Sequence, residues 1–283
     1  MKVLLTGATG YVGKLVLSGL GHKWDIIGVS TTGDGTQNIL KCDLAELEQV
    51  ENLKNLVEPQ IIIHAAGDKN LLRCEESPKL AYRANVQTTI NLINTFPDAR
   101  IIYISSDYVF SGERGGYRED DSIGPTTVYG KTKANAELAG LTLDDNFYVL
   151  RLSALYDSKA TFLSYLREML TKNEKINCFD DAFYSPTYYG DFLIVLQRMV
   201  ENLRLKRRIY HSCGQRISRF FFAKLFARAS GLDDLLIEQA SRITENAPFL
   251  FADISLENTL TCESLDVSVG RHQEYLSFLE QNR

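Results

Sequence analysis

The sequence has few of the features that mark specialised classes of protein. Its five cysteines are an odd number, widely spaced and without a Cys-x-x-Cys motif: Cys42, Cys74, Cys178, Cys213 and Cys262. This pattern argues against a disulfide framework and a zinc site, and it favours a reducing compartment. No apolar run approaches the length of a membrane span, and the first residues contain neither a basic region nor a cleavage site. We therefore expect a soluble cytoplasmic protein.

The sequence has no large excess of positive or negative charge, and it contains no internal repeat or flexible linker. The formal net charge is -5, and charged residues make up 24% of the 283 residues. This balance gives no reason to expect nucleic acid or a membrane as a partner. His22, His211 and His272 show no ligand spacing, so no metal site is expected. With 45% hydrophobic residues, the chain can bury one large core or two modest ones.

Short apolar runs alternate with amphipathic stretches in the first half of the chain. The predicted strands are 2–6, 26–29, 61–63, 101–104 and 147–150, with a short extended piece that closes at Asp43-Leu44. The predicted helices are 10–20, 46–57, a long one from Pro78 to before Pro97, and one after Pro125. This alternation predicts an α/β fold with a doubly wound, Rossmann-type parallel sheet covered on both faces.

The alternation weakens after Arg151. Helical patterns at 162–170, 191–200 and 218–229 are separated by two short segments, 175–179 and 208–211. In the first half of the chain, the polar stretch from Ser30 to Gln37 predicts a loop. We therefore predict a dinucleotide-binding domain at 1–152. A smaller, mostly helical substrate-binding part is predicted at 153–283, returning some elements to the sheet.

A glycine-rich turn lies where the first predicted strand meets the first helix. Glycines at 7, 10 and 13 permit a tight turn, close approach of the backbone to a pyrophosphate, and close packing of helix on strand. The positive end of the helix then stabilises the phosphates. Three glycines also occur in ordinary turns, but the position in a βαβ series favours dinucleotide binding. The predicted cofactor-binding residues here are Gly7, Thr9, Gly10, Tyr11, Val12 and Gly13.

Three further segments complete the predicted cofactor site. Asp43, followed by Leu44, can either accept a hydrogen bond from the adenine amino group or cap a helix. Ala65-Ala66-Gly67 is small enough for the backbone to pass under a cofactor, although it also suits a tight turn. NAD sites usually carry an acid after the second strand. Here Ser30-Thr31-Thr32-Gly33 offers hydroxyls able to bind a 2′-phosphate and no carboxylate to repel one, which favours NADP over the alternative, NAD. No arginine is present in this segment either.

Tyr129 and Lys133 form the candidate proton-transfer pair. Four residues apart in a predicted helix, they lie on the same face. A phenol has a pKa of about 10 in water, and a nearby ammonium group moves that pKa down toward working pH. The alternative is a solvated helix face. Ser105-Ser106 follows a central strand, where parallel sheets bind ligands.

Several of these motifs occur in the order found in one enzyme superfamily. They are the glycine turn, Asp43-Leu44, His64-Ala-Ala-Gly67, Ala84-Asn85-Val86, Ser105-Ser-Asp-Tyr-Val-Phe110 and Tyr129-Gly-Lys-Thr-Lys133. Together they resemble the extended short-chain dehydrogenases/reductases, and most of all the dTDP-4-dehydrorhamnose reductase family. The runs 179–188 and 210–214 are also similar to that family. The resemblance covers nearly the whole chain and fades after about Glu238.

The resemblance implies a role for each matching residue. Ser106 would orient a substrate carbonyl, and Tyr129 would donate the proton. Lys133 would lower the pKa of Tyr129 and bind the nicotinamide ribose, and Asn85 would contribute to a proton relay next to the cofactor. The substrate-binding residues implied are Ser106, Asp107, Tyr129, Ala154 and Ser185.

The implied activity is the reduction, by NADPH or NADH, of a keto group on a nucleotide-linked sugar. Family members that bind dTDP-rhamnose commonly have Trp where this chain has Ala154, which cannot stack on a sugar. An epimerase or dehydratase on the same scaffold is an alternative, although Tyr108 replaces the Glu of the dehydratase Asp-Glu pair. Another is a regulatory subunit similar to that of methionine adenosyltransferase, which binds cofactor without turnover. The partners expected are a nucleotide-sugar substrate and, as an open option, a second copy in a homodimer.

Two residues at the ends of predicted strands, His64 and Arg151, could have either a functional or a structural role. His64, at a strand end beside the nucleotide site, is interpreted as a hydrogen-bonded structural histidine. Arg151, just past another strand end, either reaches a phosphate or pairs with an acid.

Overall fold

The computed structural model describes residues 1–33, 38–245, 249–272 and 274–276, so 34–37 of the loop predicted at Ser30 to Gln37 lie outside the described residues. The chain forms two compact units. The first comprises Met1–Val109, Ser122–Arg151 and Leu193–Tyr210, and the second comprises Phe110–Asp121, Leu152–Phe192 and His211–Arg283. That the second unit binds substrate stays a prediction.

A seven-stranded sheet forms the centre of the first unit, in the order β11-β6-β5-β4-β1-β2-β3. Its strands are β1 (Lys2–Thr6), β2 (Asp25–Ser30), β3 (Ile39–Lys41), β4 (Ile61–His64), β5 (Arg100–Ser106), β6 (Phe147–Leu152) and β11 (Ile209–Ser212). The ladders from β3 through β2, β1 and β4 to β5 are all parallel. β1, β4 and β5 are apolar along nearly their whole length and buried on both faces, which is the composition that a covered parallel sheet requires.

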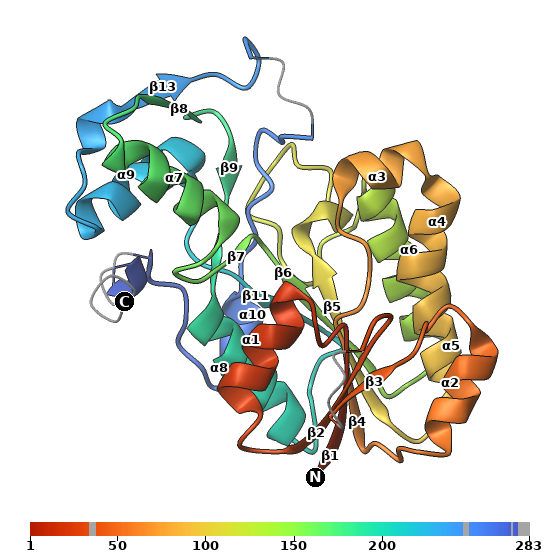
Figure 1. Ribbon diagram of the computed structural model, residues 1–283. Coiled ribbons are helices and arrows are strands. Elements are labelled where there is room, and N and C mark those ends of the chain that lie inside the picture. The colour runs from red at the N-terminus through yellow and green to blue at the C-terminus, as the bar shows by residue number, and fades with distance from the viewer. Residues whose placement is uncertain (34–37, 246–248, 273, 277–283) are drawn as a thin grey trace. The chain divides into compact units, whose positions relative to one another are not determined.

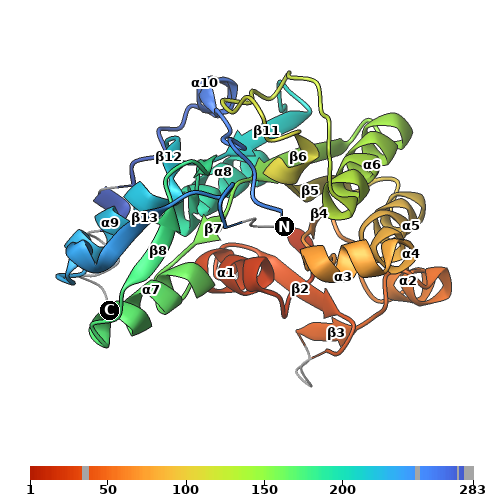
Figure 2. The same ribbon diagram turned by 90° about the horizontal axis from the view of Figure 1, so that it is seen from above.

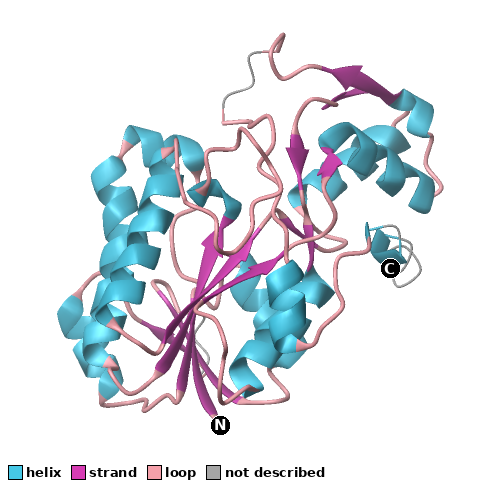
Figure 3. Ribbon diagram, turned by 180° about the vertical axis from the view of Figure 1, so that it is seen from behind, coloured by secondary structure: helices cyan, strands magenta, loops and turns pink. Residues whose placement is uncertain are grey.

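Helices cover both faces of this sheet (Figures 1 and 3). On one side lie α2 (Leu47–Lys54), α3 (Leu71–Glu76), α4 (Pro78–Tyr82), α5 (Thr88–Thr95) and α6 (Val128–Leu143). On the other side lie α1 (Tyr11–Leu20) and the end of α8 (Tyr189–Glu201). A side chain on Gly19 would lie 2.3 Å from Cδ1 of Leu193, which shows how tightly α1 packs against α8. The predicted doubly wound parallel fold is confirmed.

The long helix predicted from Pro78 is interrupted. α4 and α5 are joined by a π-helical turn, η1 (Arg83–Gln87), and α3 precedes them as a separate short helix that the sequence analysis did not predict. π-Helical turns inside helices are rare and often mark functional positions. The third strand also ends earlier than predicted, at Lys41, because Ala45 N–H donates to Asp43 Oδ1 (3.0 Å) and turns the chain there.

The second unit contains short strands in three separate pairs. β10 (Thr187–Tyr188) pairs with β7 (Leu155–Tyr156), β12 (Ile217–Ser218) with β9 (Phe183–Tyr184), and β13 (Ile237–Ala240) with β8 (Ile176–Phe179). Its other elements are α7 (Thr161–Thr171), α9 (Arg219–Ala229), α10 (Thr259–Leu265), the start of α8 and the 3-10 helix η3 (Asp234–Leu236). The three helical patterns predicted after Arg151 correspond to α7, α8 and α9.

All five cysteines have free thiols. Among the described residues, no helix has both the length and the apolar composition needed to cross a bilayer. Over the same ranges, no group of three His, Cys, Asp or Glu side chains is placed to hold a metal ion. A location in the cytoplasm stays a prediction.

Candidate active site

The phenol of Tyr129 is buried at the start of α6, close enough to the side chain of Ser106, the last residue of β5, for that side chain to lower the pKa of the phenol. The helix begins there because Gly130 N–H donates to the Oγ1 of the capping residue Thr127 (3.0 Å). Ser106 Oγ–H in turn donates to Asp107 Oδ1 (2.8 Å). The predicted residues Ser106 and Tyr129 therefore lie near one another.

Burial is the main influence on the pKa of Tyr129, and it raises that pKa. The side chain of Ser106 acts in the opposite direction, while the nearby Asp107 and Tyr108 raise the pKa further. The lowering by Lys133 that the resemblance implied is not found among these influences. At neutral pH the phenol therefore keeps its proton and is a proton donor rather than a base.

Lys133 is buried one helical turn beyond Tyr129 and is fixed by the neighbouring strand. Its ammonium group donates to the carbonyl oxygen of Ile104 (2.8 Å) and lies 4.4 Å from the centroid of the Tyr103 ring. Burial lowers the pKa of Lys133 to about 8, and Glu137 counteracts this by favouring the charged form. The amine is thus held, still mostly charged at neutral pH, next to the strand that carries Ser106.

Glu137 lies one further turn along α6 and forms a buried ion pair with Arg151 of β6. Arg151 Nη2 is 2.7 Å from Glu137 Oε2, and Arg151 Nε is 3.0 Å from Glu137 Oε1. Both side chains are 2% exposed. Of the two interpretations of Arg151, the structure thus supports pairing with an acid.

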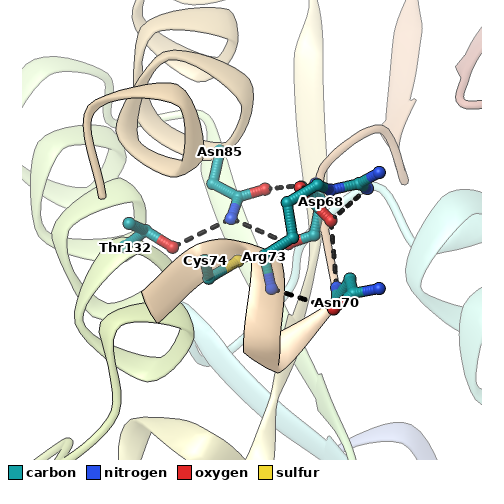
Figure 4. Close-up of polar contacts among 6 residues, drawn as sticks. All are labelled: Asp68, Asn70, Arg73, Cys74, Asn85 and Thr132. Carbon is teal, nitrogen blue, oxygen red and sulfur yellow. Dashed lines mark hydrogen bonds and ion pairs between the residues drawn. The ribbon is translucent and has the colours of Figure 1, made fainter. Parts of the chain in front are cut away.

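Asn85 lies in the π-helical turn and holds the segment that follows β4 (Figure 4). Its Oδ1 accepts from Asp68 N–H (2.7 Å), and its Nδ2 donates to the Asp68 carbonyl oxygen (3.0 Å) and to Thr132 Oγ1 (2.9 Å). A Cβ on Gly67 would lie 2.5 Å from Asn85 Oδ1 and 3.9 Å from Lys133 Nζ. The predicted residues Gly67, Asn85 and Lys133 are therefore brought together.

Small residues form a tight cradle around the start of α1. Gly7 has a φ of +66°, and a Cβ there would lie 2.8 Å from the Ala65 carbonyl oxygen and from Ala66 N. A Cβ on Gly13 would lie 2.3 Å from the Gly7 carbonyl oxygen. Within the described residues, no side chain caps the helix that begins after Gly10, and its first turn contains no acid. A dinucleotide pyrophosphate fits this uncovered N-terminus, with Thr9, Tyr11 and Val12 partly exposed around it.

The remaining residues of the predicted cofactor site, Ser30, Asp43 and Leu44, each contact other parts of the protein. Ser30 Oγ accepts from Gly33 N–H (2.9 Å) and shapes the turn after β2. Asp43 Oδ2 is 3.2 Å from Arg83 Nη2, so the carboxylate already has a charged partner, and it does not cap α2. Leu44 is buried. Binding of adenine by Asp43 and Leu44 stays a prediction.

The predicted substrate residues Ala154 and Ser185 belong to the second unit. Ala154 is exposed, and its carbonyl oxygen accepts from Thr187 N–H (3.0 Å). Ser185 is fully buried, and its Oγ accepts from Leu256 N–H (2.8 Å). A direct role for Ser185 at a substrate therefore stays a prediction, since its hydroxyl is enclosed by its own unit.

Two threonines that the sequence analysis did not single out support the site. His64 Nδ1 lies 2.7 Å from Thr6 Oγ1, and its Nε2 lies 3.1 Å from Thr89 Oγ1. Thr6 Oγ1 also accepts from Ala66 N–H (3.1 Å), which fixes the segment that packs on the glycine turn. Burial, with a contribution from Lys133, lowers the pKa of His64 to about 3. The prediction of a structural histidine is confirmed.

Comparison with known proteins agrees with this geometry. The model of the RmlD substrate binding domain family matches residues 1–275. The chain belongs to this family. A dTDP-4-dehydrorhamnose reductase of Aggregatibacter actinomycetemcomitans is 28% identical over 89% of this chain and 84% of that protein.

Two further proteins are similar to this chain. The methionine adenosyltransferase 2 subunit beta of Xenopus tropicalis is 31% identical over 75% of this chain and 67% of that protein. The crystal structure of a dTDP-4-dehydrorhamnose reductase from Bacillus anthracis in complex with NADP superposes with a TM-score of 0.87 and 23% identity, covering 100% of this chain and 99% of that one. The predicted resemblance to the reductase family is confirmed, and this chain is also similar to a protein named as a subunit of another enzyme.

Proposed function

We propose that the protein is a reductase that uses NADPH to reduce the keto group of a nucleotide-linked sugar, dTDP-4-dehydrorhamnose or a relative. The observation that carries this proposal is the buried phenol of Tyr129 near Ser106, with Lys133 anchored one helical turn away at the carbonyl oxygen of Ile104. Two relatives named as dTDP-4-dehydrorhamnose reductases, one of them in complex with NADP, support the substrate class and the cofactor.

Each residue of this group has a chemical role that its surroundings suit. Bound NADPH supplies the hydride for the carbonyl carbon. Ser106 hydrogen-bonds to the carbonyl oxygen and holds it next to the phenol, and Tyr129 donates its proton to that oxygen as negative charge develops. A phenol whose pKa is raised by burial remains protonated at neutral pH, so it suits the direction of reduction. Lys133, anchored at the carbonyl oxygen of Ile104, binds the nicotinamide ribose, as the family resemblance implies.

The test is NADPH oxidation against a panel of 4-keto sugar nucleotides. Tyr129→Phe removes the proton donor and should lower turnover by roughly 100- to 10,000-fold while NADPH binding is retained. Tyr82→Phe removes an exposed phenol from α4 and serves as the matched control. Turnover that is unchanged in Tyr129→Phe would remove the catalytic assignment.

An epimerase or dehydratase is less well supported. Dehydratases of this group resemble one another in an Asp-Glu pair after the catalytic hydroxyl residue. In this chain Asp107 is followed by Tyr108 instead of Glu. The Tyr108 ring packs edge-on against Tyr129, with centroids 5.6 Å apart, and supplies no second acid. Net consumption of added NADPH would exclude epimerisation, which leaves the cofactor unchanged overall.

A cofactor-binding regulatory subunit is the second candidate, favoured by the 31% identity to a methionine adenosyltransferase 2 subunit beta. Such a subunit would bind NADPH, oxidise none with any keto-sugar nucleotide, and associate stably with a methionine adenosyltransferase. The intact group of Ser106, Tyr129 and Lys133 supports the reductase instead. A homodimer stays an expectation that sedimentation equilibrium tests.

A further inference from the structure

The strands β2 and β3 lie side by side at one edge of the sheet (Figure 2). They run parallel, and Ser30, the last residue of β2, lies opposite Lys41, the last residue of β3. Ligands of open parallel sheets bind outside the carboxyl ends of the strands. The side chain of Lys41 therefore starts at the edge where the adenosine end of a dinucleotide lies.

The face on which Lys41 projects follows from the neighbouring glycine. A Cβ on Gly28 would lie 2.7 Å from the Cβ of Ala8 and 3.0 Å from the Cγ1 of Ile39, so this face looks toward the glycine turn. Side chains two residues apart on a strand point to the same face. Gly28 and Ile39 lie opposite each other in the two strands. Ser30 lies two residues after Gly28, and Lys41 lies two residues after Ile39, so both side chains share the face of the glycine turn.

The turn after β2 packs against the Cβ end of the Lys41 side chain. Gly33 N–H donates to Ser30 Oγ (2.9 Å), and the φ of +64° at Gly33 folds the chain back. A Cβ on Gly33 would lie 3.4 Å from the Cβ of Lys41. Lys41 is exposed, and within the described ranges no carboxylate forms an ion pair with it.

We propose that Lys41 binds the 2′-phosphate of NADP and sets the preference of this protein for NADP over NAD. The inference rests on the proposed cofactor of the reductase and extends it to a specific residue. In a βαβ dinucleotide site, the residue that follows the second strand contacts the adenosine ribose, through a carboxylate in NAD proteins and through a cation in NADP proteins. Here the turn from Ser30 to Gly33 offers no cation, and the ammonium group comes from the next strand instead.

The test measures binding rather than turnover. Dissociation constants of NADPH, NADH, adenosine 2′,5′-bisphosphate and AMP are measured for the wild type, Lys41→Ala and Lys41→Glu. Lys54→Ala removes an equally exposed lysine from α2 and controls for the change in net charge. Circular dichroism checks that each variant is folded.

Loss of a charge-assisted contact should raise the dissociation constants of NADPH and of the bisphosphate roughly 10- to 100-fold in Lys41→Ala. The dissociation constants of NADH and AMP should change less than twofold, and Lys41→Glu should bind NADPH more weakly still. The wild-type preference for NADPH should fall as salt rises, and that salt dependence should disappear in Lys41→Ala.

Equal weakening of NADPH and NADH, or no change in either, would overturn the assignment of Lys41, and so would a wild type that binds neither cofactor. Because no sugar is present, these results are independent of the proposed reduction. A protein that binds NADPH through Lys41 but reduces no keto sugar would overturn only the proposed function. An active reductase whose Lys41→Ala variant binds NADPH normally would overturn only this inference.

Discussion

Lys133 Nζ donates a hydrogen bond to the carbonyl oxygen of Ile104 at 2.8 Å, inside a site where burial lowers the pKa of that amine to about 8. Activity and stability should therefore respond in opposite directions at alkaline pH. Above about pH 8 the amine loses the charge with which it holds the nicotinamide ribose in the proposed mechanism, and turnover should fall.

Stability follows from the lowered pKa. The unfolded chain keeps its proton up to the ordinary lysine pKa of 10.5, while the folded chain releases it at about 8. The unfolded state binds more protons between these values, so the contribution of Lys133 to the free energy of unfolding should rise with pH over this window. Urea unfolding of the wild type and Lys133→Met at several pH values measures the difference. A Lys133 contribution that falls between pH 8 and 10.5 would contradict the lowered pKa.

The parts of the fold that were predicted from sequence are those set by local patterns. The apolar runs of β1, β4 and β5 and the glycines after β1 identify a buried parallel sheet without knowledge of any distant contact. The spacing of Tyr129 and Lys133 likewise places both on one face of α6. These features depend on residues within one helix or strand.

The parts that were missed depend on contacts between distant residues. The π-helical turn coincides with Asn85, whose amide bonds to Asp68, 17 positions away, and to Thr132, 47 positions away. The pKa of Tyr129 was expected to fall, but burial, which the spacing of two residues does not reveal, raises it. Lys41 approaches Ser30 only through the register of two strands.

Asn85→Ala should destabilise the protein more than the loss of one hydrogen bond would. The substitution leaves Asp68 N–H, the Asp68 carbonyl oxygen and Thr132 Oγ1 without the Asn85 amide (Figure 4). We expect a loss of about 2 to 4 kcal/mol in the free energy of unfolding, measured by urea denaturation. Thr132→Val removes one of the three bonds together with the bond from Thr132 Oγ1 to the Tyr129 carbonyl oxygen (2.8 Å), and it should cost about 1 to 2 kcal/mol. Equal losses in the two variants would show that Asn85 does not hold the Asp68 backbone.

Glu137→Gln should both destabilise the fold and shift the pH dependence of turnover. The buried guanidinium of Arg151 loses its charged partner, which costs about 3 to 5 kcal/mol when a buried pair is broken on one side. Because Glu137 favours the charged form of Lys133, its removal lowers the pKa of Lys133 further, and the alkaline fall in turnover should begin at lower pH.

Two comparisons test this interpretation of the buried pair. The double variant Glu137→Leu, Arg151→Met should be more stable than either single variant, because no charge is left buried alone. Glu168→Gln breaks the exposed pair with Lys172 and should leave the free energy of unfolding nearly unchanged. Additive losses in the double variant would mean that the two side chains do not act as a pair.

His64 should make the protein less stable in acid. Its pKa is lowered from 6.5 to about 3, so the unfolded chain binds a proton that the folded chain refuses between these values. The free energy of unfolding should fall as pH drops through this window, by about 2 kcal/mol between about pH 7 and about pH 5. Asp191 acts in the opposite direction, since burial raises its pKa to about 6 and the folded chain then takes up the proton first.

The difference between wild type and His64→Asn isolates this effect, because Asp191 contributes equally to both. Unfolding curves at each pH should show that His64→Asn, although less stable at neutral pH, loses about 2 kcal/mol less on acidification than the wild type. His22→Asn changes an exposed histidine and serves as the matched control. An identical dependence of the free energy of unfolding on pH in the wild type and His64→Asn would show that His64 takes up its proton in the folded protein. The burial of His64 and its bonds to Thr6 and Thr89 oppose that uptake.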